Sequence, residues 1–189
     1  MRLHHAGLAG ALASVMLTAV VAGPPAATAA QPQPKCTAPP LPGQVVNVTL
    51  ADMGSGTKSP SPRPYGAPAP HEMTTDTKMT LSVAPATVRA GTVSLRVTNK
   101  GTFAHQVVVL PLPTGQTVGQ REVGSDMRVD EAGRLGEASN NCGAGTGGGI
   151  SPASMGWTTL KLPPGRYELV CNFPGHYARG MYAELNVTG

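Results

Sequence analysis

The sequence predicts an all-β fold, a β-sandwich or a β-barrel, from its composition and its hydrophobic pattern. Gly and Pro supply 24 and 19 of the 189 residues, whereas aromatic residues make up only 4% and charged residues 13%. Because Gly and Pro interrupt regular elements and favour turns, this composition disfavours long helices. About seven short apolar or alternating segments are separated by turn residues, and none has the length of a long helix. The chain length corresponds to one domain.

The first 30 residues are predicted to be a secretory signal peptide. A basic start precedes an apolar run over residues 8–22, and the small residues 27–29 form a cleavage site. The run is shorter than the about 20 residues that a membrane-spanning helix needs. No later segment is long and apolar enough to span a bilayer. We therefore expect a soluble, secreted or extracytoplasmic protein, in the periplasm or the cell-wall space, where disulfides form.

The remaining chain is predicted to be one domain, residues 44–189, preceded by a Pro-rich leader over residues 31–43. The Pro-rich segment 54–76 is expected to be a surface insertion or a polyproline-like linker. The Gly-rich, polar segment 114–156 is expected to be a long loop with at most a short helix around 130–138. Loops of this length are usually functional, tethered or mobile.

Seven strands are expected between these segments. The clearest spans residues 92–98, where apolar and polar residues alternate as in a strand with one buried face. Pro111 ends the strand before the long loop, and residues 163–165 form a Pro-Pro-Gly turn between two later strands. The expected strands cover residues 45–50, 78–83, 92–98, 104–110, 157–162, 166–171 and 181–187.

The expected mature chain carries a small positive charge. The full chain has a formal net charge of +4, and loss of Arg2 with the signal peptide leaves +3. The basic residues are scattered, so the sequence predicts no nucleic-acid partner. The mature chain retains three histidines, His71, His105 and His176, which excludes chemistry that needs many imidazoles.

Residues with metal-binding chemistry are concentrated near the C-terminus. A thiol, an imidazole and a thioether follow one another at intervals of five residues, at Cys171, His176 and Met181. With a second histidine, this is the ligand set of a blue-copper electron-transfer site. Strand alternation places both sulfurs at strand ends on inward, apolar faces.

The second histidine is either His71 or His105. His105 begins a predicted strand in which Val107 and Val109 lie on the same face, so its ring is directed into the core beside the thiol. His71 lies in the Pro-rich insertion, where the pattern indicates no fixed geometry. The sequence therefore favours His105.

A short motif and four potential ligands occur in a fixed order: Asn99-Lys100-Gly101, His105, Cys171, His176 and Met181. This arrangement resembles the cupredoxin family, and the sulfocyanin-type blue copper proteins in particular. The resemblance covers most of residues 45–187 and implies a Greek-key β-sandwich with one type 1 copper ion near one end. It implies His105, Cys171 and His176 as equatorial ligands and Met181 as the axial ligand. One difference is Gln106, because many family members have Asn or Asp there, where it ties the ligand loops together.

The resemblance implies an electron carrier and not an enzyme. Such a protein, as a monomer, would transfer single electrons between transient redox partners by cycling between Cu(II) and Cu(I). His176 would be the electron port within a small apolar docking patch. Phe173, Pro174 and one face of Tyr177 would form the apolar shell. The alternative is extracytoplasmic copper storage or delivery with the same ligands.

Other chemistries fit these residues less well. Zinc sites rarely use a thioether, and a Cys/His hydrolase leaves the spacing of Met181 unexplained. A multicopper oxidase or copper nitrite reductase needs further histidine-rich centres, for which only His71 remains. A structural adhesion sandwich with a vestigial site is the alternative from another class.

The chain has three cysteines, so they cannot all pair with one another. With Cys171 assigned to the metal, Cys36 and Cys142 remain. They lie in the leader and in the long loop. We hypothesise that they form a disulfide that fixes both segments to the sandwich.

Overall fold

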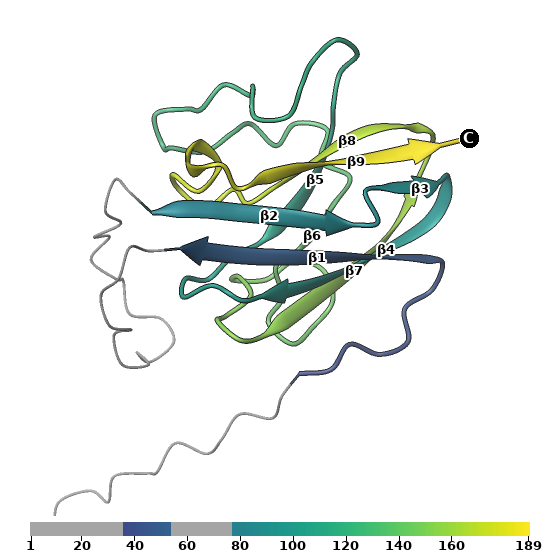
Figure 1. Ribbon diagram of the computed structural model, residues 1–189, viewed down its shortest axis with the longest axis horizontal. Coiled ribbons are helices and arrows are strands. Elements are labelled where there is room, and N and C mark those ends of the chain that lie inside the picture. Colours follow the sequence, from purple (N-terminus) through teal and green to yellow (C-terminus); the bar gives the residue numbers. More distant parts are fainter. Residues whose placement is uncertain (1–35, 54–76) are drawn as a thin grey trace, which may run out of the picture. The chain divides into compact units, whose positions relative to one another are not determined.

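The structure, a computed structural model, describes residues 36–53 and 77–189. The predicted signal peptide, the predicted insertion over 54–76 and His71 lie outside these residues. No helix in the described ranges is long and apolar enough to cross a membrane. The elements (Figure 1) are β1 (Gln44–Met53), β2 (Lys78–Ala84), β3 (Thr87–Arg89), β4 (Gly91–Asn99), β5 (Val107–Pro111), β6 (Gly136–Ala138), β7 (Met155–Leu162), β8 (Gly165–Val170), the 3₁₀ helix η1 (Tyr177–Arg179) and β9 (Tyr182–Thr188).

The strands form two sheets, one in the order β2-β1-β4-β7 and one in the order β3-β9-β8-β5-β6. β1 is parallel to β4 and β3 is parallel to β9, whereas the other neighbours are antiparallel. Several neighbours in a sheet are distant in the sequence, so the chain crosses between the sheets, as Greek-key connections do. The predicted Greek-key β-sandwich is confirmed.

The core between the sheets is built by strand alternation. Every second residue of β1 and β4 is buried on the same face, as the alternating pattern predicts. Full burial of such a side chain contributes about 1.5–3 kcal/mol. The opposing sheet supplies apolar residues of β8 and β9 to the same cluster. The buried core residues that these four strands contribute include Val46, Val48, Leu50, Val93, Leu95, Val97, Leu169, Leu185 and Val187.

β5 and β8 are buried on both faces. Their second face forms a smaller apolar cluster in which Val108, Leu110 and Val170 pack with Val129 and Tyr177. Val129 comes from the long segment between β5 and β7, so this segment covers the outer face of the sheet. A strand covered on both sides has a continuous apolar sequence, which accounts for the run at the start of β5.

The long segment is tethered to the sheet by a short strand. Residues 112–154, all of which the structure describes, contain no helix, within the expectation of at most a short one around 130–138. Instead β6 pairs with the edge of β5, with Val108 opposite Glu137. The edge strand offers unpaired backbone groups, and pairing with them is more favourable for this short segment than an isolated helical turn.

All seven predicted strands are present, with small shifts at their ends. The largest shift is in the strand predicted from residue 104, which begins at Val107 because His105 makes only an isolated bridge with Ile150. β3 and β6 were not predicted. Each has three residues, which is too short for alternation to be recognised.

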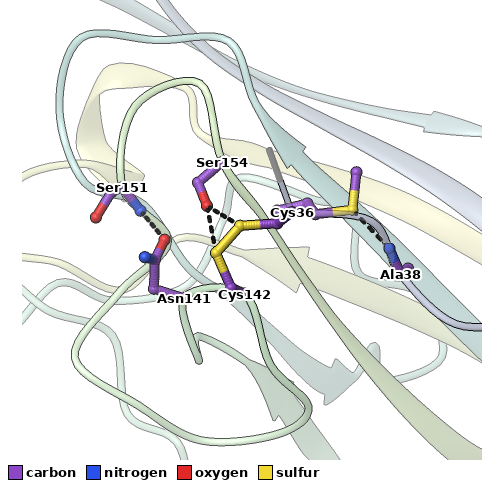
Figure 2. The surroundings of a disulfide bond; sticks show 7 residues. Cys36, Ala38, Asn141, Cys142, Ser151 and Ser154 are labelled. Carbon is purple, nitrogen blue, oxygen red and sulfur yellow. Dashed lines mark hydrogen bonds between the residues drawn. A yellow bond between two sulfur atoms is a disulfide. The ribbon is translucent and has the colours of Figure 1, made fainter. Parts of the chain in front are cut away.

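Cys36 and Cys142 form a disulfide, which confirms the predicted pairing (Figure 2). Their Cα atoms are 5.3 Å apart, within the usual range for a disulfide. The Ser154 hydroxyl lies 3.2 Å from the sulfur of Cys36 and 3.4 Å from that of Cys142. The backbone N–H of Ala38 donates to the sulfur of Met155 at 3.1 Å. The segment before β1 is thus attached to the start of β7.

Candidate metal centre

Three potential ligands that are distant in the sequence meet at one buried point. The ligand atoms of His105, Cys171 and His176 all lie within 4.8 Å of one another. The Cys171 sulfur is 3.3 Å from Nδ1 of His176 and 3.9 Å from Nδ1 of His105. The two Nδ1 atoms are 3.2 Å apart. Both imidazoles therefore present the same nitrogen to the sulfur.

His105 is held in this orientation by its other nitrogen. Its backbone pairs with Ile150 in both directions, and its Nε2 lies 2.8 Å from Oδ1 of Asp52. Burial raises the pKa of the Asp52 carboxyl, but hydrogen bonds from His105, Thr102 and Phe103 outweigh this and hold the pKa well below its usual value. An ionised carboxylate only accepts, so Nε2 carries the proton and the lone pair of Nδ1 is directed toward Cys171.

Cys171 follows β8 and is completely buried. Burial raises the pKa of its thiol to about 12, and the backbone N–H groups of Gln106 and Phe173 offset part of this effect. The Gln106 N–H lies 3.4 Å from the sulfur. The positive charge of a metal ion favours the thiolate strongly enough to overcome such a shift. The site thus combines a soft donor with a nearby N–H that stabilises negative charge on it.

The loop from Cys171 to Met181 closes on itself through its backbone. The N–H of Cys171 donates to the carbonyl of Met181 at 3.0 Å, and the N–H of Met181 donates to the carbonyl of His176 at 3.2 Å. Gly175 has a φ of 78°, which the Pro-Gly turn requires. These bonds connect the backbone of Met181, whose side chain is completely buried in the main core, to the backbones of Cys171 and His176. Within this loop the donor atoms of Cys171 and His176 lie together, 3.3 Å apart.

The surroundings of the site differ in one respect from the prediction. Phe173 packs edge-on against His176, with ring centroids 5.7 Å apart, as an apolar shell requires. Tyr177 instead belongs to the second cluster, and its hydroxyl donates to Glu168 at 2.9 Å. Because η1 follows His176 directly, the chain turns there and directs the next side chain away from the main core.

The segment before His105 is organised by the Asn-Lys-Gly motif. The side chain of Asn99 donates to the carbonyls of Phe103 and Ile150 at 2.7 and 2.8 Å, and it accepts the N–H of Gly101 at 2.8 Å. Gln106 contributes its backbone N–H to the sulfur. This N–H, 3.4 Å from the Cys171 sulfur, links the segment after His105 to the ligand loop.

The donor set fits copper. A buried thiol, two imidazole Nδ1 atoms and a buried thioether combine soft and intermediate donors, which suits copper better than zinc or hard cations. A His, Cys, His and Met set in a two-sheet all-β sandwich defines the class of type 1 copper proteins, the cupredoxins.

The sulfocyanin (SoxE) domain family matches residues 69–189, and the chain belongs to this family. Among solved structures, auracyanin B is 20% identical with a TM-score of 0.44, covering 80% of this chain and 94% of its own. Rusticyanin from Thiobacillus ferrooxidans is 24% identical with a TM-score of 0.38, covering 78% and 79%. Auracyanin from Roseiflexus castenholzii is 20% identical with a TM-score of 0.40, covering 57% and 88%. No curated protein matches.

Proposed function

We propose that the protein carries single electrons between redox partners outside the cytoplasm, with one copper ion held by His105, Cys171, His176 and Met181. The first three are proposed as equatorial ligands and Met181 as the axial ligand. The observation that carries this proposal is the convergence of three buried donors within 4.8 Å. Sulfocyanin-type cupredoxins are electron carriers and not enzymes.

The protein holds the proposed copper ligands in fixed positions. Copper bound at this point supplies a one-electron couple between Cu(II) and Cu(I). His105 is fixed through Asp52, while Cys171 and Met181 are fixed by their mutual backbone hydrogen bond. Donors that keep their places in both oxidation states favour fast electron transfer, because little rearrangement accompanies each step.

His176 is the proposed route for electrons. It is 5% exposed, whereas His105, Cys171 and Met181 are completely buried. Phe173 and Pro174, both half-buried, flank it in the loop. Met127, which is 55% exposed, accepts a hydrogen bond from the N–H of Gly175 through its carbonyl. An apolar patch of this kind suits brief encounters with a redox partner.

Export is proposed from two features. The disulfide between Cys36 and Cys142 is typical of an oxidising compartment. Residues 1–30 have the pattern of a signal peptide. Residues 31–189 are proposed to form the mature protein, in the periplasm or the cell-wall space.

The test is to load the mature protein with Cu(II) and record its visible and paramagnetic spectra. We expect a strong thiolate-to-copper charge-transfer band and narrow hyperfine splitting. Cys171→Ser is expected to abolish the band, whereas His71→Ala is expected to leave it unchanged. A colourless protein that binds copper only through oxygen and nitrogen would contradict the proposal. Fast, reversible reduction indicates electron transfer, and rapid release of copper to a chelator indicates storage or delivery.

A further inference from the structure

Asp52 is a buried carboxylate beside the proposed ligands but outside their set. Its side chain is 1% exposed and its Oδ1 lies 2.8 Å from Nε2 of His105, whose side chain is completely buried. The backbone N–H of Thr102 donates to both oxygens, at 2.7 and 2.9 Å, and the N–H of Phe103 donates to Oδ1 at 3.2 Å. A buried charge is costly unless it is hydrogen-bonded, and these donors satisfy that need.

Gly101 provides the space for this carboxylate. A Cβ atom at this position would lie 1.8 Å from Oδ1 of Asp52 and 2.9 Å from Nε2 of His105. Neither distance is compatible with a side chain, so the glycine is required by the close approach of these two groups. Asn99 fixes the same turn by accepting the N–H of Gly101. The turn formed by the Asn-Lys-Gly motif thus leaves room for the contact between Asp52 and His105.

The pair joins the end of β1 to the segment between β4 and β5. Asp52 is near the end of β1, which is parallel to β4, and Leu50 of β1 lies opposite Asn99 at the end of β4. The N–H of Lys100 donates to the carbonyl of Leu50 at 2.8 Å, which continues the pairing beyond β4. The carboxylate is therefore placed by sheet register, on the rigid part of the fold.

We propose that Asp52 is a positioning residue that keeps Nδ1 of His105 directed at the copper and, through its negative charge, favours Cu(II) over Cu(I). This inference rests on the proposed copper site. A carboxylate that accepts the second N–H of a ligand histidine fixes its tautomer and raises its basicity. A buried negative charge also stabilises Cu(II) more strongly than Cu(I), because the attraction grows with the charge of the ion. The buried surroundings screen this attraction only weakly. Both effects lower the reduction potential.

The test compares Asp52→Asn with Asp130→Asn in the copper-loaded mature protein. Asp130 is exposed, so the control removes the same charge from a solvated position. We expect Asp52→Asn to weaken Cu(II) binding roughly 10- to 100-fold and Cu(I) binding less. Each tenfold difference between the loss of Cu(II) affinity and the loss of Cu(I) affinity raises the reduction potential by 59 mV. Asp130→Asn is expected to change neither quantity.

A separate measurement tests the orientation without copper. Nitrogen-15 NMR of the wild-type protein, stripped of metal, is expected to show His105 protonated at Nε2. A proton at Nδ1, or an Asp52→Asn protein that keeps its blue band and its potential, would overturn the inference and leave the proposed function standing. A wild-type protein without a blue band would overturn the proposed function. If Asp52→Asn fails to fold, the wild-type tautomer still decides the inference.

Discussion

Asn172 and Val129 are joined by two hydrogen bonds. The N–H of Val129 donates to Oδ1 of Asn172 at 2.8 Å, and the amide of Asn172 donates to the carbonyl of Val129 at 2.9 Å. Asn172 follows Cys171 directly, and Val129 lies in the long segment that covers the outer face of the second sheet. The ligand loop is thereby attached to this segment as if to a neighbouring strand.

Asn172→Ala is expected to lower the free energy of unfolding by about 1 to 3 kcal/mol, because it leaves the buried backbone groups of Val129 without partners. Urea denaturation measures this change. Asn47→Ala, at an exposed position of β1, is the control and is expected to have little effect. Equal effects of the two substitutions would show that the pair with Val129 contributes nothing specific.

Removal of the disulfide is expected to lower stability without changing the copper site. Cys36 and Cys142 lie 106 residues apart in the sequence, and a native disulfide typically contributes about 2 to 4 kcal/mol. The double variant Cys36→Ser, Cys142→Ser is expected to lose this amount in urea denaturation. Its visible spectrum is expected to match the wild type, because neither sulfur belongs to the site. A changed blue band would contradict the separation of these two roles.

The sequence allowed prediction of features that depend on local patterns. Alternation in residues 92–98 predicted β4, and the five-residue intervals of Cys171, His176 and Met181 predicted the ligand loop. Strand parity also favoured His105 over His71, and the structure places His105 beside the thiol.

Features that depend on pairing between distant segments were not predicted. Asp52 lies 53 residues before His105 and reaches it only through the register of β1 with β4. No spacing near either residue indicates this contact. In the same way, the direction of the Tyr177 side chain depends on the turn at η1. Strand alternation does not describe such a turn.

The buried residues Glu168 and Tyr177 form a polar group with the half-buried Arg121. Glu168, completely buried, accepts hydrogen bonds from Nε of Arg121 at 2.6 Å and from the hydroxyl of Tyr177 at 2.9 Å. Tyr177→Phe is expected to cost about 1 kcal/mol and Glu168→Gln about 1.5 to 3 kcal/mol in the free energy of unfolding. The double variant is expected to lose less than the sum, because both changes break the same bond. Strict additivity in this cycle would argue against a shared interaction.

Gly101→Ala is expected to disturb the pair of Asp52 and His105. The added Cβ would overlap Oδ1 of Asp52, so the carboxylate must move, and such overpacking typically costs about 1 to 3 kcal/mol. The blue band is expected to shift, because His105 loses its fixed orientation. Gly165→Ala is the control, since its Cβ would meet only ordinary contacts from 3.5 Å. An unchanged spectrum in Gly101→Ala would show that the ring does not depend on this contact.

Alkaline pH is expected to destabilise the protein after a chelator has removed its metal. Burial raises the pKa of the Cys171 thiol from 9.0 to about 12, so between these values the unfolded chain releases a proton that the folded chain keeps. The free energy of unfolding should therefore fall by about 1.4 kcal/mol per pH unit over this interval. Burial also raises the pKa of Tyr177 from 10.0 to about 12, which adds to the fall above pH 10. Denaturation of the metal-free wild type and of Cys171→Ser is measured at pH 9 and pH 10. The free energy of unfolding should fall between these pH values in the wild type but not in Cys171→Ser. An equal fall in the two proteins would exclude the thiol as its source.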